Sequence, residues 1–226
     1  MCGIIGILSN SDINIFEFII ESLLQLQNRG YDSSGICLLN KEDYILHKYA
    51  STVNEDAIQK LKKINLSDTN NKVGIGHNRW ATHGPKNDIN AHPHMSNNEE
   101  IVIIHNGIIE NFKELKDFLI KSGYKFHTNT DTEVIANLLE YNNNNNNNEK
   151  DFSKVIKKTI DELNGTYGLI IMNKKENNRL YCVRNGSPLL LGYNDDYAII
   201  TSEQSGFCNK INTYITLHND DICFIE

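Results

Sequence analysis

The chain opens with MCGIIG at residues 1–6, so Cys2 directly follows the initiator methionine. Small residues in second position usually allow an aminopeptidase to remove that methionine, which would make Cys2 the first residue. It would then carry a thiol nucleophile and an α-amino group of pKa about 7.7–8.0, which can serve as its base. The alternative interpretation is a small buried cysteine at the start of a β-strand, since free cysteine usually packs as a small hydrophobic residue.

Composition indicates a soluble protein of modest size. The 226 residues, 39% of them hydrophobic, suffice for one sizeable core or two small ones. A net charge of −7 argues against nucleic-acid binding as the main function. No apolar stretch approaches the length of a membrane span, and the apolar start is too short for a signal peptide. The five cysteines are widely spaced without a CxxC pair, which is typical of a reducing cytosol. We therefore expect a cytoplasmic protein with neither a membrane nor a nucleic-acid partner.

Hydrophobic periodicity predicts groups of strands separated by helices. Strands are expected at residues 2–8, 34–39, 44–49, 73–80, 101–105, 166–173, 179–184, 188–193, 197–201, 213–217 and 222–225. Helices are expected at residues 13–27, 53–64, 111–122, 130–141 and 152–163. Because this order lacks the regular βαβ alternation of a doubly wound fold, we predict an α+β fold with layered antiparallel sheets.

Capping residues mark several of the expected helix starts. Asp12 is a candidate N-cap for the first helix, Asn111 forms a possible cap pair with Glu114, and TDTE at 130–133 is a capping-box pattern. The asparagine run at 142–148 cannot bury apolar surface, so it predicts a mobile surface loop without a functional role. No linker suggests a second domain, and we expect one domain over residues 1–226.

Two polar segments flank the predicted strands of the first half. The segment NRGYDSSG at 28–35 is most simply a turn between a helix and a strand, because Gly, Asp and Ser favour turns. The segment HNRWATHG at 77–84 places Arg79 beside Trp80, the single tryptophan, at the end of an apolar strand. The planar fork of an arginine suits a carboxylate ligand, although Arg79 could equally pair with a structural acid.

Two further segments offer groups for catalysis or binding. Asn106 and Gly107 follow a predicted strand, and an amide with a neighbouring backbone N–H can form an oxyanion hole. The alternative is an ordinary Asn-Gly turn. Asp131 could hold a substrate ammonium group, or could simply favour the dipole of the helix that it opens.

Histidines cluster between residues 77 and 105, with His92 and His94 as the closest pair. No carboxylate stands at a recognisable ligand spacing and no HExxH motif occurs, so we expect no metal site. Neither a Walker A motif nor GxGxxG is present, so we expect no nucleotide cofactor.

The sequence thus offers four candidate features for one site. They are a cysteine nucleophile with its own base, an oxyanion hole, and an Arg and an Asp for the two charges of an amino acid. Together they predict acyl transfer from a side-chain amide, with glutamine as the natural substrate.

These segments resemble the class II glutamine amidotransferases, which have the N-terminal-nucleophile fold. Within that class, the chain is similar to the glutaminase domain of the glutamine–fructose-6-phosphate aminotransferases. The matching segments are MCGIIG at 1–6, RGYDS at 29–33, RWATHG at 79–84, NAHPH at 90–94, HNGIIEN at 105–111, TDTEVI at 130–135 and GSPL at 186–189. They occur in the family's order across nearly the whole chain. Purine-pathway amidotransferases share Cys-Gly and His-Asn-Gly but differ at RGYDS and RWATHG.

The resemblance implies a four-layer αββα sandwich and a role for each matching residue. Cys2 would be the nucleophile, and Asn106 with the Gly107 N–H would stabilise the oxyanion. Arg79 would bind the carboxylate of L-glutamine and Asp131 its ammonium group. The remaining residues belong to the loop that would close over the substrate: Trp80, Thr82 and His83.

The resemblance also implies a partner. In the family, ammonia passes to a sugar-phosphate isomerase domain that holds fructose 6-phosphate, and residues 1–226 contain no counterpart of that domain. The chain would therefore be an excised glutaminase domain, or a stand-alone glutaminase that serves a separate synthase subunit. Two alternatives stay open: a class II glutaminase that serves another acceptor, and a non-catalytic glutamine-binding or regulatory module.

Overall fold

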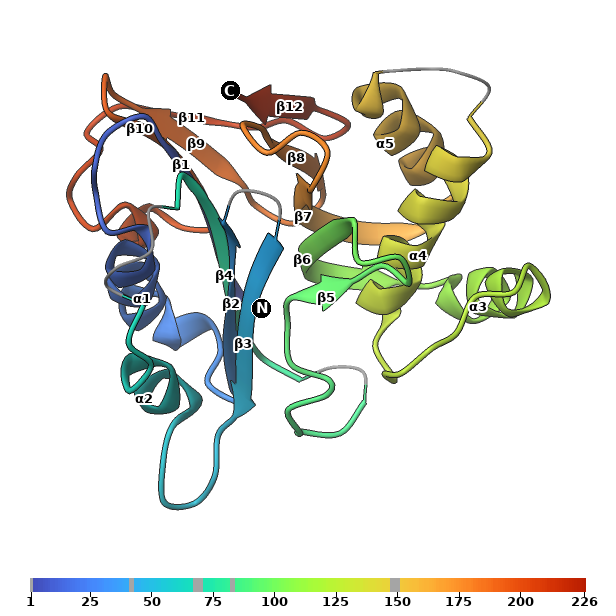
Figure 1. Cartoon of the computed structure of the whole chain (residues 1–226), viewed down its shortest axis with the longest axis horizontal. Helices are drawn as coiled ribbons and strands as arrows, with labels where there is room; N and C mark the ends of the chain where they lie inside the picture. Colours follow the sequence, from blue (N-terminus) through green and yellow to red (C-terminus); the bar gives the residue numbers. More distant parts are fainter. Residues whose placement is uncertain (1, 41–42, 67–70, 82–83, 147–150) are drawn as a thin grey trace.

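Two antiparallel β-sheets face each other at the centre of the molecule, and helices cover the outer face of each (Figure 1). The computed structural model describes residues 2–40, 43–66, 71–81, 84–146 and 151–226. The strand order is β11-β9-β10-β1-β4-β2-β3 in the seven-stranded sheet and β12-β8-β7-β6-β5 in the five-stranded sheet. The predicted α+β class with layered antiparallel sheets is confirmed.

The seven-stranded sheet carries the N-terminal strand at its centre. Its strands, in sheet order, are β11 (Tyr214–Thr216), β9 (Leu190–Tyr193), β10 (Tyr197–Thr201), β1 (Gly3–Ser9), β4 (Val73–Arg79), β2 (Ser33–Asn40) and β3 (Asp43–Ala50). Helices α1 (Ile15–Gln25) and α2 (Ala57–Lys62) pack on its outer face, together with the short 3₁₀ turn η2 (Gln204–Phe207). A second 3₁₀ turn, η1 (Gln27–Arg29), follows α1. Their apolar side chains form one helix-on-sheet core.

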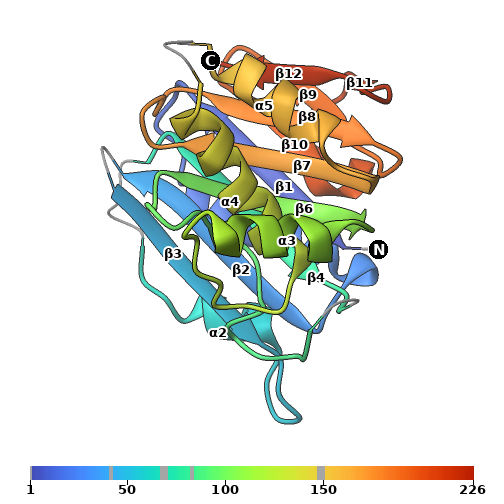
Figure 2. The same ribbon diagram turned by 90° about the vertical axis from the view of Figure 1, so that its right-hand side faces the viewer.

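The five-stranded sheet consists of β12 (Ile222–Ile225), β8 (Leu180–Asn185), β7 (Gly165–Asn173), β6 (Ile101–Ile109) and β5 (His94–Met95). Helices α3 (Phe112–Lys121), α4 (Asp131–Asn144) and α5 (Phe152–Asp161) cover its outer face, as Figure 2 shows. A third apolar core fills the space between the two sheets. The expected four-layer αββα sandwich is therefore confirmed. Among the described residues, no helix is both long and apolar enough to cross a lipid bilayer.

Strand β6 is longer than the sequence pattern predicts. It continues past residue 105 to Ile109, because Asn106 and Gly107 pair with Gly168 and Tyr167 of β7. The alternative of a plain Asn-Gly turn is therefore wrong. Gly107 has φ +145°, and a Cβ there would lie 2.0 Å from the carbonyl oxygen of Thr166, so only glycine fits this position.

Two helix starts also differ from the expectation. Asn14, rather than Asp12, caps α1, because its Oδ1 accepts a hydrogen bond from the Glu17 N–H at 3.1 Å. The predicted helix over 53–64 begins only at Ala57. Thr130 caps α4 as predicted, since its Oγ1 accepts from the Glu133 N–H at 3.3 Å. The capping box is not completed, because the Glu133 carboxylate accepts from the His127 and Thr128 N–H groups instead.

The asparagine run begins inside a helix rather than in a loop. Helix α4 extends to Asn144, and the buried Asn142 side chain donates to Thr159 Oγ1 at 3.2 Å and to Glu162 Oε1 at 2.9 Å. These bonds join α4 to α5, so the expected loop over 142–148 is wrong at its first three positions. Residues 147 and 148 lie outside the described residues. A single domain over 1–226 stays a prediction.

Candidate active site

Cys2 immediately precedes β1, the strand that lies between β10 and β4 at the centre of its sheet. Its Sγ accepts a hydrogen bond from the Trp80 N–H at 3.3 Å. Burial raises the pKa of the Cys2 thiol, although the Trp80 N–H and the charges of Arg79 and Arg29 act in the opposite direction. The thiol therefore needs a base to become a nucleophile near neutral pH.

The backbone of Cys2 is held on both of its polar groups. The Cys2 nitrogen donates to Asn106 Oδ1 at 3.1 Å, and Asn106 Nδ2 donates to the Cys2 carbonyl oxygen at 3.0 Å. Arg29 Nε donates to the same carbonyl at 3.0 Å. A residue at the very start of the chain is thus anchored to β6 of the opposite sheet and to η1 of its own layer.

Arg29 is held in turn by a carboxylate. Its Nη1 lies 3.0 Å from Glu203 Oε2, while Asn28 Nδ2 and Ser205 Oγ donate to Glu203 Oε1 at 3.3 and 3.2 Å. Burial alone would raise the pKa of Glu203, but the hydrogen bonds from Arg29, Asn28 and Ser205 lower it below its usual range. The charged carboxylate therefore fixes the guanidinium that supports Cys2.

Residues 30 and 32 bring the end of β4 against the nucleophile. Asp32 Oδ2 accepts from the Ala81 N–H at 2.9 Å, and the Asp32 N–H donates to the Arg79 carbonyl at 3.0 Å. A Cβ on Gly30 would lie 2.7 Å from the carbonyl carbon of Arg79, so this close approach requires glycine. The segment 28–35 is therefore part of the site and not merely a turn. Its residue types alone did not reveal this, although RGYDS was one of the segments that carried the family resemblance.

Arg79 ends β4 and is only 3% exposed. Burial lowers the pKa of its guanidinium, while the nearby Cys2, Asp32 and Asp131 act to raise it. One of its nitrogens donates to the Pro85 carbonyl at 3.3 Å. An arginine pKa is so high that the group stays charged, and a buried cation of this kind attracts an anionic ligand.

Asp131 is the first residue of α4 and is 5% exposed. Its Oδ2 accepts from the Ile109 N–H at 2.9 Å, which joins the end of β6 to the start of the helix. The same oxygen lies 3.9 Å from His105 Nδ1. A buried carboxylate thus lies near the buried guanidinium of Arg79, and both border the cavity that holds Cys2.

Thr132 connects two buried histidines behind Asp131. Its Oγ1 lies 2.8 Å from His92 Nε2 and 3.1 Å from His105 Nδ1. A hydroxyl donates one hydrogen bond and accepts others, so Thr132 can donate to one imidazole nitrogen and accept from the other. Residue types pointed to neither His105 nor Thr132 as part of the site, and only their place inside the HNG and TDTE segments indicates them.

Two more buried histidines, His77 and His94, extend this network. The His77 ring stacks on His92 at 4.0 Å between centroids, and His94 Nε2 lies 3.2 Å from Thr130 Oγ1. Burial lowers the pKa of His77 to about 3 and that of His92 and His94 well below the ordinary value, so these rings are neutral. Within the described residues, no group of three or more His, Cys, Asp or Glu side chains is arranged to hold a metal ion.

These side chains border a cavity of about 20 Å³ that is partly open to solvent. It is lined by Cys2, Arg79, Trp80, His92, His105, Gly107, Thr130, Asp131 and Thr132. This volume fits about one water molecule, so a larger ligand would extend out of the cavity or move the lining residues apart. Trp80 stands at the mouth, 46% exposed and edge-on to Tyr31 at 5.6 Å.

The predicted site residues have thus mostly come together. Cys2, Arg79, Trp80, Gly107 and Asp131 line one cavity, and Asn106 is bonded to Cys2. Thr82 and His83 lie outside the described residues.

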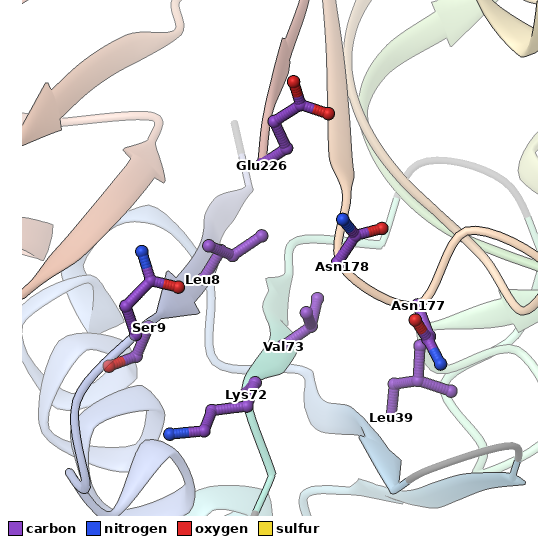
Figure 3. Close-up of a pocket in the computed structure, with 9 residues that line it drawn as sticks. Leu8, Ser9, Leu39, Lys72, Val73, Asn177, Asn178 and Glu226 are labelled. Carbon is purple, nitrogen blue, oxygen red and sulfur yellow. The ribbon is translucent and has the colours of Figure 1, made fainter.

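A larger cavity of about 410 Å³ lies at the other end of β1 (Figure 3). It is lined by Leu8, Ser9, Asn10, Leu39, Lys72, Val73, Asn177, Asn178 and Glu226. Strand β1 runs from Gly3 beside Cys2 to Ser9 at this cavity, a separation of about 20 Å at the usual rise per residue. The large cavity is therefore separate from the cysteine site.

Known proteins are similar to this chain in sequence. Residues 77–209, which include Arg79, Asn106, Gly107 and Asp131, match a glutamine amidotransferase domain. The chain belongs to the glutamine amidotransferase family. It is 41% identical to the glutamine–fructose-6-phosphate aminotransferase (isomerizing) of Methanococcus maripaludis and 39% identical to that of Thermococcus kodakarensis, in both cases over the whole chain. It covers only 37% and 36% of the length of those two proteins.

The fold of this glutamine amidotransferase domain agrees with solved structures. The glutamine phosphoribosylpyrophosphate amidotransferase of B. subtilis, solved with ADP and GMP, superposes with a TM-score of 0.80 at 26% sequence identity. The match covers 99% of this chain and 47% of that one. The expected N-terminal-nucleophile fold is therefore confirmed, and Cys2 immediately precedes the central strand of its sheet.

Proposed function

We propose that Cys2, once Met1 has been removed, attacks the side-chain amide of L-glutamine to form a thioester and release ammonia. Water then hydrolyses the thioester to glutamate and restores the thiol. One observation carries this proposal: the Cys2 thiol shares a cavity with the buried, oppositely charged Arg79 and Asp131. That combination matches an α-amino acid whose side chain ends at a nucleophile.

The proton movements follow from the position of the Cys2 nitrogen. Removal of Met1 turns this nitrogen into an α-amine, whose ordinary pKa near 7.7–8.0 suits a general base. The amine takes the thiol proton as the sulfur attacks, and then delivers a proton to the departing ammonia. Asn106 Oδ1, which accepts from this nitrogen at 3.1 Å, orients the amine throughout.

Asn106 and Gly107 stabilise the negative oxygen of the tetrahedral intermediate. One Nδ2 hydrogen of Asn106 is committed to the Cys2 carbonyl, and an amide has a second one to give. The Gly107 N–H belongs to the same strand and Gly107 lines the cavity. Donors fixed in a buried site need no reorganisation when charge develops, which is the source of their catalytic effect.

The charged ends of glutamine are bound by the two buried charges. Arg79 binds the α-carboxylate and Asp131 the α-ammonium group. Because the cavity has a volume of only about 20 Å³, glutamine binding would extend past its mouth at Trp80 or move the lining residues apart. We assign Thr82 and His83 to the loop that closes over the substrate on the basis of the family resemblance.

We further propose that the ammonia serves the amination of fructose 6-phosphate in a sugar-phosphate isomerase domain or subunit. Support comes from the relatives that share 39–41% identity and carry that name. A different acceptor is the second candidate, because the structural neighbour of B. subtilis is named for phosphoribosylpyrophosphate. The wide spacing of the cysteines supports a cytoplasmic location.

The deciding experiment measures glutamate release from L-glutamine by the purified chain, beside the Cys2→Ala variant, after mass spectrometry has shown a free Cys2. We expect release by the parent and none by the variant. A parent that binds glutamine without turnover despite a free Cys2 would mark a non-catalytic module. Reconstitution with a separately expressed isomerase domain from a relative then tests the acceptor, with glucosamine 6-phosphate as the expected product.

A further inference from the structure

Cys182 and Cys223 lie directly opposite each other on the neighbouring strands β8 and β12. Residues in direct register across an antiparallel pair have Cα atoms about 4.5–5.5 Å apart, with their side chains on the same face of the sheet. A disulfide requires a Cα separation of about 4.4–6.8 Å. Both cysteines are free thiols in this structure. The strand register therefore places two reduced sulfurs at a spacing that a disulfide can bridge.

The two sulfurs also differ in exposure. Both side chains face the core between the sheets, where Cys182 is fully buried and Cys223 is only partly buried. Strand β12 is the edge of the five-stranded sheet, so Cys223 is the member that a small reagent reaches first. The pair thus has an outer and an inner sulfur.

The pKa shifts of the two thiols also distinguish the outer sulfur, Cys223, from the inner one, Cys182. The adjoining Cys182 thiol lowers the pKa of Cys223 to about 7, although burial and the nearby Asp221 act to raise it. The closeness of Cys223, together with burial, raises the pKa of Cys182. A thiolate is the reactive form of cysteine, so near neutral pH the outer sulfur reacts while the inner one keeps its proton.

We propose that Cys182 and Cys223 form a redox pair that a hydroperoxide converts to a cross-strand disulfide, with Cys223 as the attacking sulfur. The Cys223 thiolate attacks one peroxide oxygen, the O–O bond breaks, and a sulfenic acid forms on Cys223 as hydroxide leaves. The Cys182 sulfur then attacks the Cys223 sulfur, and the sulfenic oxygen leaves as water with the Cys182 proton. Two thiols lose two electrons in total, and the hydroperoxide accepts them.

The disulfide would join the edge strand covalently to its neighbour. Strand β12 is attached to the sheet on one side only, through its pairing with β8. A covalent link at its second residue prevents the strand from leaving the sheet, and edge elements of this kind otherwise open locally. Oxidation would thus stabilise this edge, which belongs to the five-stranded sheet, whereas Cys2 precedes β1 of the other sheet.

Two other cysteines provide matched controls. Cys37 is buried and lies opposite Leu46 and Ile75 on its two neighbouring strands. Cys208 is partly exposed at the end of η2, and burial raises the pKa of its thiol to about 11. One control matches the burial of Cys182 and the other the exposure of Cys223, and neither has a cysteine in register.

Peptide mapping tests the proposal directly. The full chain in a Cys2→Ala background is treated with hydrogen peroxide and then denatured in the presence of N-ethylmaleimide, which blocks the remaining free thiols. It is then digested with trypsin without reductant. Cleavage after Arg179, Arg184 and Lys210 separates Cys182, Cys208 and Cys223 into three peptides, 180–184, 185–210 and 211–226. We expect the peptides 180–184 and 211–226 to appear as one linked species that reduction separates. Maleimide on both cysteines after peroxide treatment, or oxidation that stops at Cys223, would overturn the proposal.

A second measurement guards against an artefact of denaturation. Hydrogen exchange of the backbone amides of β12 is compared before and after peroxide treatment in the same background, in Cys223→Ser and in Cys208→Ser. We expect exchange of β12 to slow at least severalfold in the background and in Cys208→Ser but to stay unchanged in Cys223→Ser. Unchanged exchange in all three proteins would contradict a native cross-strand disulfide even where linked peptides were found.

Discussion

Asn106 holds both backbone polar groups of Cys2, accepting from its nitrogen at 3.1 Å and donating to its carbonyl at 3.0 Å. This reciprocal pair spans the two sheets, because Cys2 precedes β1 and Asn106 lies in β6. The orientation of the amide is settled by the pairing, since only one assignment of its oxygen and nitrogen satisfies both bonds. The same side chain that contributes to the proposed oxyanion hole therefore also positions the nucleophile.

We expect Asn106→Ala to lower kcat for glutamine hydrolysis by about 10²–10³-fold, the usual cost of one oxyanion donor. Asn106→Asp keeps only the acceptor role, because a carboxylate still accepts from the Cys2 amine but can donate neither to the Cys2 carbonyl nor to the oxyanion. Steady-state kinetics would show a similar decrease in kcat for both variants if the donor role dominates. A near-normal Asn106→Asp would instead show that positioning of the amine is the main contribution.

Arg79→Lys should weaken glutamine binding more than it slows the chemical step, because lysine keeps the charge but loses the planar fork. The parent should prefer glutamine to its α-amide, which lacks the carboxylate, by about ten- to a hundredfold in kcat/KM. In Arg79→Lys this preference should shrink. Circular dichroism controls for folding, since Arg79 is buried. An unchanged preference would place the carboxylate elsewhere.

Glu203→Gln should loosen Arg29 and reduce activity by only about two- to fivefold, because the ion pair is partly exposed. The pair also predicts a pH dependence. The pKa of Glu203 is lowered in the folded protein, so its stabilising effect is complete above the ordinary glutamate pKa of about 4.3. That effect is lost as the pH falls through the lower folded value.

Thermal denaturation at a series of acidic pH values checks this expectation. The difference in Tm between the parent and Glu203→Gln should be constant near neutral pH and should narrow as the solution is acidified. A difference that grows on acidification would contradict the sign of the pKa shift.

Thr132→Val removes the hydroxyl that joins His92 and His105 while keeping the shape of the side chain. Two buried imidazole nitrogens lose a partner, so the free energy of unfolding should fall by about 1–3 kcal/mol. Thr132→Ser keeps the hydroxyl and is the matched control. Its free energy of unfolding should fall by less. Urea denaturation measures both, and equal losses would mean that the methyl group matters more than the hydrogen bonds.

Much of the architecture could be predicted from local pattern. Strands β10 and β12 begin and end where apolar runs predict them, because short apolar stretches between turn residues have few alternatives. The predicted end of strand β6 is wrong, and the reason is physical. An Asn-Gly pair favours a turn locally, but the ladder with β7 carries the strand through Asn106 and Gly107. Long-range pairing of this kind is not visible in a local window.

Some residues of the site could likewise be predicted from the sequence and others could not. Arg79 and Asp131 could be chosen from residue type and motif, since each offers a charge at the end of a strand or the start of a helix. Arg29 and Thr132 could not, because their importance lies in which distant atoms they contact: the Cys2 carbonyl for one and two imidazoles for the other. Such contacts arise only when the two sheets and α4 pack together.

The anchoring of Cys2 has a practical consequence for recombinant work. Chain ends usually fray and tolerate added residues, whereas this one is fixed by Asn106 and Arg29 beside a cavity with room for a single water molecule. An affinity tag fused ahead of Cys2 would block the amine and crowd the cavity, and the purified material would be folded yet inert. A tag fused after Glu226, or a cleavable leader whose protease leaves a bare cysteine, keeps the preparation fit for assay.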